Sequence, residues 1–146
     1  MRFALHTPIL AGLMMVASLS HAASLDGTQW TTVDENGAPK SVIQFKADGK
    51  GTYSGTIVKL LKGATMTTCT KCSGASKNRP LVGLTVVHHL KDSGGNEFVD
   101  GEIFDPKTGK TYQMKGKLSA DGKSFEMRGF VGLSLLGRSQ TWTRAN

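Results

Sequence analysis

The two cysteines of this 146-residue chain, Cys69 and Cys72, are three positions apart. This spacing suits thiol–disulfide exchange, part of a zinc site or a structural disulfide. Thioredoxin-like redox chemistry needs the cysteines at the start of a helix beside a parallel sheet, and a structural zinc ion needs four ligands. Neither context surrounds this pair in the sequence. We therefore expect a disulfide, no metal and no cofactor, with metal binding and redox catalysis as the alternatives.

His88 and His89 are neighbours in a segment with apolar residues at alternate positions. Adjacent residues of a strand point to opposite faces, so the alternation places His88 inside with Leu84 and Val86, and His89 outside. An inward histidine is either a hydrogen-bonded core residue or part of a binding or catalytic site. We expect a core role and keep His88 as a candidate ligand-binding residue.

Alternate residues near the C-terminus share one face of an expected strand: Arg138, Gln140, Trp142 and Arg144. If Trp142 faces inward, Arg138 and Gln140 lie inside toward the same end as Tyr112. A buried arginine needs an acceptor, which a ligand carboxylate or phosphate can supply. These three residues are therefore candidates for a ligand-binding site, and pairing of Arg138 with Asp105 or a loop carbonyl is the alternative.

The scaffold that must position these side chains has the pattern of an all-β protein. Short runs rich in Val, Ile, Thr and aromatic residues recur between turn signals such as Asp48-Gly49 and Asp121-Gly122. The sequence predicts eight strands, near residues 27–33, 41–47, 51–61, 84–90, 97–104, 110–119, 123–131 and 138–144. Antiparallel strands in sequence order can close into a small up-and-down barrel without exposed edges. We expect such a barrel as one domain over residues 23–146, with a two-sheet sandwich as the alternative.

A single alternation phase fits four of these strands. If Leu90 pairs with Glu97, one phase places these residues inside: Leu84, Val86, His88, Val99, Gly101, Ile103, Tyr112, Met114, Leu118, Phe125, Met127 and Val131. The outer face then carries, among others, Thr85, Val87, His89, Phe98, Asp100 and Glu102. An eight-stranded barrel has room inside for packed side chains or for one small ligand.

The connections of such a barrel alternate between its two ends. Tight turns and both termini gather at one end, the closed end, and longer connections at the other, the open end: residues 34–39, 62–82, 105–109 and 132–137. Residues 62–82 exceed the ~12–15 at which a structureless loop becomes unusual, so we expect either a lid over the opening or an idle ordered loop. Leu133, Leu135 and Leu136 either fold inward as a plug or form an apolar rim.

The first 22 residues have the pattern of a cleaved secretory signal peptide. Arg2 supplies a positive start, an apolar stretch covers residues 9–17, and Ser20-His21-Ala22 offers small residues at both positions that a signal peptidase recognises. The apolar stretch is about half the ~20 residues of a spanning helix, which leaves a membrane anchor as the alternative. We expect a periplasmic or secreted protein that is not an integral membrane protein.

Composition excludes several classes of protein. With 38% hydrophobic residues and 4 Pro, the chain is neither disordered nor fibrous, and 2 Cys are too few for a disulfide-dense scaffold. The net charge is +7, but the lysines are scattered among acidic residues and form no basic run interleaved with aromatic residues. Nucleic acid is therefore not an expected partner.

Several stretches in a fixed order carry a family resemblance: Trp30 before the run 32–41, Cys69-x-x-Cys72, Gly101-x-Ile103-x-Asp105-Pro106-x-x-Gly109-Lys110-x-Tyr112, Arg128-Gly129-Phe130-x-Gly132 and Leu136-Gly137-Arg138-x-x-x-Trp142-x-Arg144. Over essentially the whole chain beyond residue 22, this pattern resembles the exported bacterial domain-of-unknown-function family 2147. The resemblance implies a calycin-like barrel, of the lipocalin or avidin kind, and no agreed activity. In that architecture the first-strand tryptophan packs beneath a last-strand arginine at the closed end, which implies structural roles for Trp30 and Arg144.

No sequence motif points to catalysis, because the chain lacks a nucleophile elbow, a phosphate loop, a dinucleotide fingerprint and a metalloprotease helix. We expect a non-catalytic binding module for a small amphiphilic or apolar ligand, with the ligand's acidic end near Arg138 and with Trp142 structural. The alternative is an envelope interaction or structural protein with a solid barrel, and an enzyme is the third possibility. A filled interior favours the solid barrel, whereas an open apolar cavity favours the binding module.

Overall fold

The computed structural model describes Gly12, residues 24–133 and residues 136–146, so the predicted signal peptide lies, apart from Gly12, outside the described residues. The strands are β1 (Gln29–Val33), β2 (Pro39–Ala47), β3 (Thr52–Leu60), β4 (Thr85–Gly94), β5 (Glu97–Asp105), β6 (Lys110–Leu118), β7 (Ser124–Phe130) and β8 (Arg138–Arg144). A short 3₁₀ turn, η1 (Gly74–Ser76), lies between β3 and β4. Within this part of the chain, no helix has the length and apolar character needed to cross a membrane.

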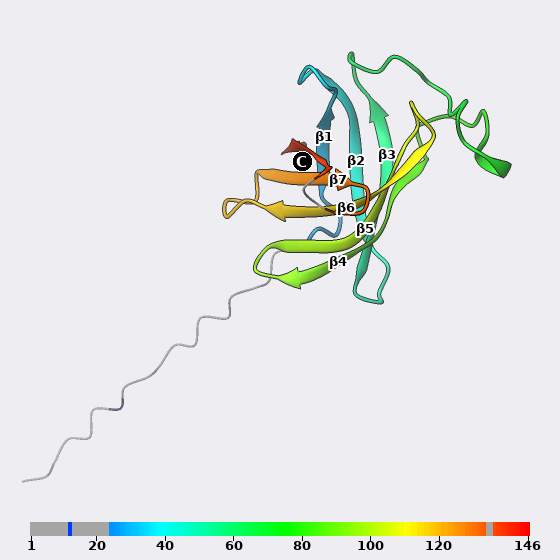
Figure 1. Ribbon diagram of the computed structural model, residues 1–146. Coiled ribbons are helices and arrows are strands. Elements are labelled where there is room, and N and C mark those ends of the chain that lie inside the picture. Colours follow the sequence, from blue (N-terminus) through cyan, green and yellow to red (C-terminus); the bar gives the residue numbers. More distant parts are fainter. Residues whose placement is uncertain (1–11, 13–23, 134–135) are drawn as a thin grey trace, which may run out of the picture.

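The eight strands form one closed barrel in sequence order (Figure 1). Every neighbouring pair is antiparallel, and the barrel closes where Trp30 and Thr31 of β1 pair with Arg144 and Thr143 of β8. Closure gives each strand a partner on both sides, which removes the exposed edges of an open sheet. The predicted up-and-down barrel is confirmed, and the sandwich alternative is wrong.

Tight turns at the closed end form where aspartate and glycine follow each other. Gly49 and Gly122 both have positive φ, 75° and 70°, as such turns require. Asp48 accepts hydrogen bonds from the backbone N–H of Lys50 and from the hydroxyl of Thr52. These bonds stabilise the ionised carboxylate, with the Thr52 hydroxyl contributing most, and they lower the pKa of Asp48.

Two positive-φ residues on β4 and β5 change the predicted alternation. His89 and Asp100 both have a φ of 58°, and the strands pair as His88 with Glu102 and Lys91 with Val99 instead of Leu90 with Glu97. Backbone in this region rotates the next side chain away from the regular phase.

Three assignments of the single-phase prediction are wrong, and a register shift between Gly55 and Thr56 on β3, opposite Val86, contributes together with Asp100. Val87 and Phe98, expected outside, are fully buried, and His88, expected inside, is exposed. Val86, Gly101, Met114, Leu118, Phe125 and Met127 are buried as predicted. Val131, also expected inside, is 65% exposed because β7 ends one residue earlier.

Aromatic rings fill the closed end of the barrel. The rings of Trp30, Phe45, Phe98 and Trp142 each lie 5.7–5.9 Å from the ring of Phe125. A Cβ atom at position 116 would overlap the Phe125 ring, so the glycine there makes room for the cluster. Solid packing of this kind leaves no space for a ligand in this half of the barrel.

Trp30 forms the floor of the closed end. Its side chain is fully buried, and its indole Nε1 donates a hydrogen bond of 2.7 Å to the Thr28 hydroxyl. The Arg144 guanidinium lies over the indole, 5.5 Å from the ring centroid. The predicted packing of the first-strand tryptophan beneath the last-strand arginine is confirmed.

Candidate functional site

The open half of the barrel contains a cavity of about 390 Å³. Its lining comes from every strand except β6 and from three of the open-end connections. Apolar side chains dominate the deeper walls: Ile43, Ile57, Leu60, Leu81, Val86, Ile103, Phe104, Met127 and Trp142. Trp142 belongs both to this lining and to the aromatic cluster below, so the cluster forms the bottom of the cavity.

Gln140 is a polar side chain on the cavity wall, two residues before Trp142 on β8. Its side-chain oxygen accepts a hydrogen bond of 3.1 Å from the indole Nε1 of Trp142. An indole nitrogen can only donate, so the amide must present its oxygen to Trp142. The half-buried amide nitrogen, with two N–H donors, is then free of this bond and available to an acceptor in the cavity.

Thr32 and Ser41 add a second polar group to the wall. They are paired across β1 and β2, both are buried, and their hydroxyl oxygens lie 2.7 Å apart. Thr32 Oγ1 also lies 3.3 Å from the Ser41 carbonyl, to which it donates. Thr32 donates to that carbonyl and Ser41 donates to Thr32, so both hydroxyl protons are used. The remaining lone pairs of the two hydroxyl oxygens can only accept hydrogen bonds.

Charged residues of the cavity lining lie at its rim: Asp34, Glu35, Lys40, Asp105 and Lys107. Asp34 accepts the backbone N–H groups of Asn36 and Ala38, so its carboxylate is bound to its own turn. Asp105 likewise accepts from the Lys107 backbone N–H and the Thr108 hydroxyl. Among the described residues the two lysines form no ion pair, which leaves their ammonium groups available to a ligand.

The four candidate ligand-binding residues are not brought together. Gln140 lines the cavity, but Arg138 is exposed and Tyr112 is half-buried outside the cavity lining. The alternation along β8 is correct, yet Arg138 is the first residue of the strand and already lies in solvent. His88 is exposed because the β3–β4 register shifts opposite Val86, so that Val86 and Val87 are both buried and His88 lies outside. The predicted convergence of Arg138, Gln140 and Tyr112 just inside the opening is therefore wrong.

Sequence reasoning missed Thr32, Ser41 and Lys40 as lining residues. Thr32 follows the inward Trp30 at a spacing of two, so the alternation of β1 contained the signal. Lys40 is half-buried at the second position of β2, where the strand enters the barrel wall from the open end. Nothing in the sequence separates such a lysine from the scattered surface lysines.

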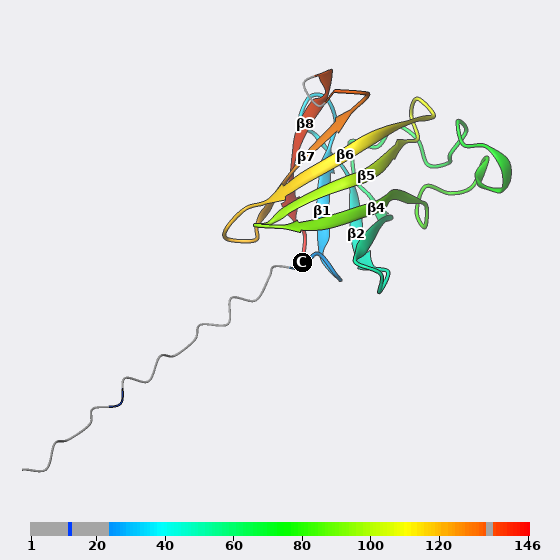
Figure 2. The same cartoon turned by 60° about the horizontal axis from the view of Figure 1, so that its bottom comes forward.

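The long connection between β3 and β4 reaches the cavity only with its two ends. Residues 64–66 and Leu81 line the cavity, and the backbone N–H of Leu81 donates to the carbonyl of Thr67. Figures 1 and 2 both show the middle of this green segment standing out beside the turn between β5 and β6. The expected lid is therefore limited to these ends, while the centre extends away from the barrel.

Cys69 and Cys72 lie in the extended part of this connection, with their sulfur atoms at bonding distance and their Cα atoms 5.3 Å apart. Both side chains are buried, and Asn78 donates its backbone N–H to the Cys69 carbonyl. The predicted disulfide is confirmed. Within the described ranges, no three histidine, cysteine or carboxylate side chains are grouped as a metal site would require.

The plug interpretation of the last open-end connection is wrong for the two leucines that the structure describes. Leu133 and Leu136 are 69% and 78% exposed, and neither lines the cavity. Leu135, the third leucine of that prediction, lies outside the described residues.

A closed eight-stranded antiparallel barrel, solid at one end and hollow at the other, is a lipocalin-like architecture. The structure described as "Protein HP1028 from the human pathogen Helicobacter pylori belongs to the lipocalin family" is similar, with a TM-score of 0.73, 18% identity and 84% of each chain covered. At this identity the likeness shows the fold alone. The chain belongs to the family of uncharacterised proteins conserved in bacteria, DUF2147, whose model matches residues 28–144. No curated protein matches the chain.

Proposed function

We propose that this protein is an exported, non-catalytic binding module for one small, mainly apolar ligand held in the open-end cavity. The observation that carries the proposal is the division of the barrel interior. Aromatic rings fill the closed half, whereas the open half holds a cavity of about 390 Å³ with mainly apolar deeper walls. Concave, mostly apolar cavities of this size with a few polar groups are typical small-molecule sites.

The cavity sets the size of the ligand. Its volume of about 390 Å³ lies near the lower end of the roughly 300–1,000 Å³ that is typical of small-molecule sites. A ligand with on the order of 10–15 non-hydrogen atoms would fill it. Ten-carbon alcohols and acids are therefore suitable probes.

The polar groups define where an oxygen of the ligand would bind. The amide nitrogen of Gln140 offers donors, and the Thr32–Ser41 pair offers an acceptor. An uncharged hydroxyl or carbonyl oxygen suits these groups, because burying an ionised carboxylate without a charged partner is costly. An acidic end would instead lie at the rim near Lys40 and Lys107, and not near Arg138 as the sequence suggested.

Export and the lack of catalysis belong to this proposal as well. The signal-peptide pattern and a disulfide between closely spaced cysteines support an oxidising compartment outside the cytoplasm. The amide and hydroxyl groups of the cavity wall suit binding, since neither described histidine lines the cavity and both rim aspartates are bound to their own turns. The exposed Leu133 and Leu136 favour, as a second candidate, interaction with an envelope component.

The test is a fluorescence titration of the chain from Ser24, which contains the whole barrel. The variant Trp30→Phe leaves Trp142, at the bottom of the cavity, as the only tryptophan reporter. Decan-1-ol, decanoate and decyltrimethylammonium are compared as probes. We expect saturable binding of decan-1-ol, weakened about 2–10-fold by Gln140→Leu through loss of one hydrogen bond.

Gln113→Leu is the matched control, because Gln113 is exposed on β6, the strand that contributes nothing to the cavity lining, and should not change the affinity. A cavity-filling variant, Val86→Trp, should abolish binding while the barrel remains folded by circular dichroism. Absence of saturable binding for all three probes would overturn the proposed function and leave the envelope interaction protein as the better explanation.

A further inference from the structure

The charge of the barrel is distributed unequally between its two ends. We count the side chains in each connection or terminal segment together with the one flanking residue on either side. The open end carries three acidic residues, Asp34, Glu35 and Asp105, and seven basic residues, which gives it a net charge of +4. The closed end has four acidic and three basic residues by the same count, a net charge of −1.

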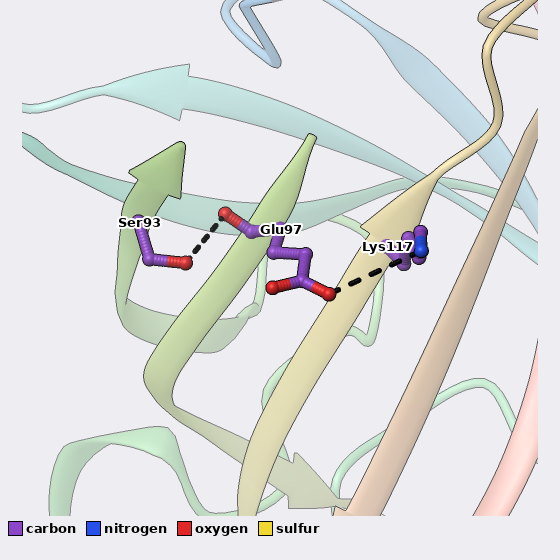
Figure 3. A network of polar contacts seen from close by, with 3 residues as sticks. All are labelled: Ser93, Glu97 and Lys117. Carbon is purple, nitrogen blue, oxygen red and sulfur yellow. Dashed lines mark hydrogen bonds and ion pairs between the residues drawn. The ribbon is translucent and has the colours of Figure 1, made fainter. Parts of the chain in front are cut away.

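The seven basic side chains of the open end are exposed. Four of them, Lys62, Lys71, Lys77 and Arg79, lie in the β3–β4 connection, which contains no acidic residue. The others are Lys107, Lys110 and Arg138. The ion pair seen among the described residues, Lys117 with Glu97 at 4.0 Å, lies toward the other end, where Ser93 also donates to the Glu97 carbonyl (Figure 3). Among the described residues, the cations of the open end therefore have no carboxylate partner.

Exposed apolar side chains gather at the same end. The large hydrophobic residues that are exposed in the described chain are Val82, Val131, Leu133 and Leu136. All four belong to open-end connections, and three of them follow β7 within six residues. Apolar side chains on a connection that is surrounded by lysine and arginine are typical of surfaces that enter the interface of an anionic membrane.

We propose that the open end docks on the surface of an anionic phospholipid bilayer. The leucines and valines would enter the boundary between headgroups and acyl chains, while the seven cations would contact lipid phosphates. In this orientation the cavity opening faces the bilayer and the solid closed end faces water. The inference goes beyond ligand binding and does not depend on it, because six of the seven cations and all four exposed apolar residues lie outside the cavity lining.

A bilayer fits the surface better than a folded acidic partner. The cations are spread over the β3–β4 and β5–β6 connections and the first residues of β6 and β8, and the exposed apolar residues lie in two separate connections. A planar array of phosphates contacts a dispersed set of cations at once, whereas a protein interface needs a complementary, well-packed core.

The test is co-sedimentation of the chain from Ser24 with vesicles. One set contains phosphatidylglycerol mixed with phosphatidylethanolamine, and the other contains phosphatidylcholine alone. We expect binding to the anionic vesicles that falls as salt is raised, because salt screens the cation–phosphate attraction. Two open-end variants, Leu133→Asp with Leu136→Asp and Lys77→Glu with Lys110→Glu, should each lower the partition coefficient roughly tenfold or more.

Matched closed-end variants make the same charge changes far from the proposed surface. They are Ala47→Asp with Ala120→Asp, and Lys50→Glu with Lys123→Glu, all at exposed positions. No sedimentation with anionic vesicles, equal sedimentation with phosphatidylcholine, or an equal loss in the closed-end variants would overturn the proposal. The decan-1-ol titration contains no vesicles, so failure of docking and failure of ligand binding are separate results.

Discussion

Replacing Trp30 by alanine should destabilise the barrel by about 3–5 kcal/mol, the usual cost of truncating a fully buried tryptophan. The indole is 0% exposed, and its ring packs 5.7 Å from the Phe125 ring and 5.5 Å from the Arg144 guanidinium. A buried aromatic side chain removes about 150–250 Å² from water, which at about 25 cal/mol per Å² corresponds to roughly 4–6 kcal/mol before relaxation of the cavity. The truncation also removes the donor of the 2.7 Å hydrogen bond to Thr28.

The measurement is urea unfolding of the native chain, Trp30→Ala and Trp30→Phe, followed by far-ultraviolet circular dichroism. Trp30→Phe keeps an aromatic ring at the floor and should lose about 1–3 kcal/mol less than alanine. Arg144→Ala should cost only about 0.5–1 kcal/mol through the lost contact with the ring, because the arginine is exposed. A loss below 1 kcal/mol for Trp30→Ala would refute the reasoning that the closed end is a single packed unit.

Three further predictions concern separate parts of the barrel. The pKa of Asp48 is lowered in the folded state, so the contribution of this carboxylate to stability is present above its ordinary value of 3.8 and is lost as the pH falls through the lower folded value. In acid unfolding experiments, the free energy of unfolding of Asp48→Asn should therefore depend less on pH in that range. Intact mass with and without reduction and alkylation should reveal one Cys69–Cys72 bond worth about 2 kcal/mol in the loop-entropy model, and two free thiols or a bound zinc ion would contradict it. Gly116→Ala should destabilise the fold by about 1–3 kcal/mol because its Cβ would overlap a buried ring, whereas Gly129→Ala, with its nearest neighbour at 3.8 Å, should lower the unfolding midpoint much less.

The local sequence was sufficient to predict the strands, the tight turns and the order in which the strands pair. Asp48-Gly49 and Asp121-Gly122 predict tight turns because positive φ is accessible to glycine without a steric penalty, and both turns lie where they were expected. Eight short β-rich runs between such turns leave an up-and-down barrel as the simplest closed arrangement. The sorting of connections into a closed and an open end follows from that topology alone, and the cavity lies at the predicted end.

The facing of individual side chains depended on tertiary structure. His and Asp adopt positive φ more often than most residues, but residue type does not show which of them does so. The positive φ of Asp100 brings Phe98 into the barrel, and the irregular pairing opposite Val86 moves His88 out. Because the side-chain period of a strand is two, a single irregular residue inverts every assignment beyond it. Alternation therefore identified most of the buried residues on β6 and β7, which pair in regular register, and failed on β4 and β5.

The sequence by itself determined that the chain folds as a barrel, which end carries the longer connections and that Trp30 and Arg144 lie at the closed end, whereas their packing was implied by the family resemblance. These features depend on turn chemistry, strand order and pairing of the first strand with the last, all of which are local or follow from closure. Only the tertiary structure decided that the interior is half solid and half hollow. That division depends on how the rings of five strands and the connection residues fill a shared volume, and no alternation pattern measures volume. For the same reason Gln140 lines the cavity and Arg138 does not. Both lie on the inward face of β8, but Arg138 is at the very end of the barrel and is exposed, whereas Gln140 lies deeper and is half-buried.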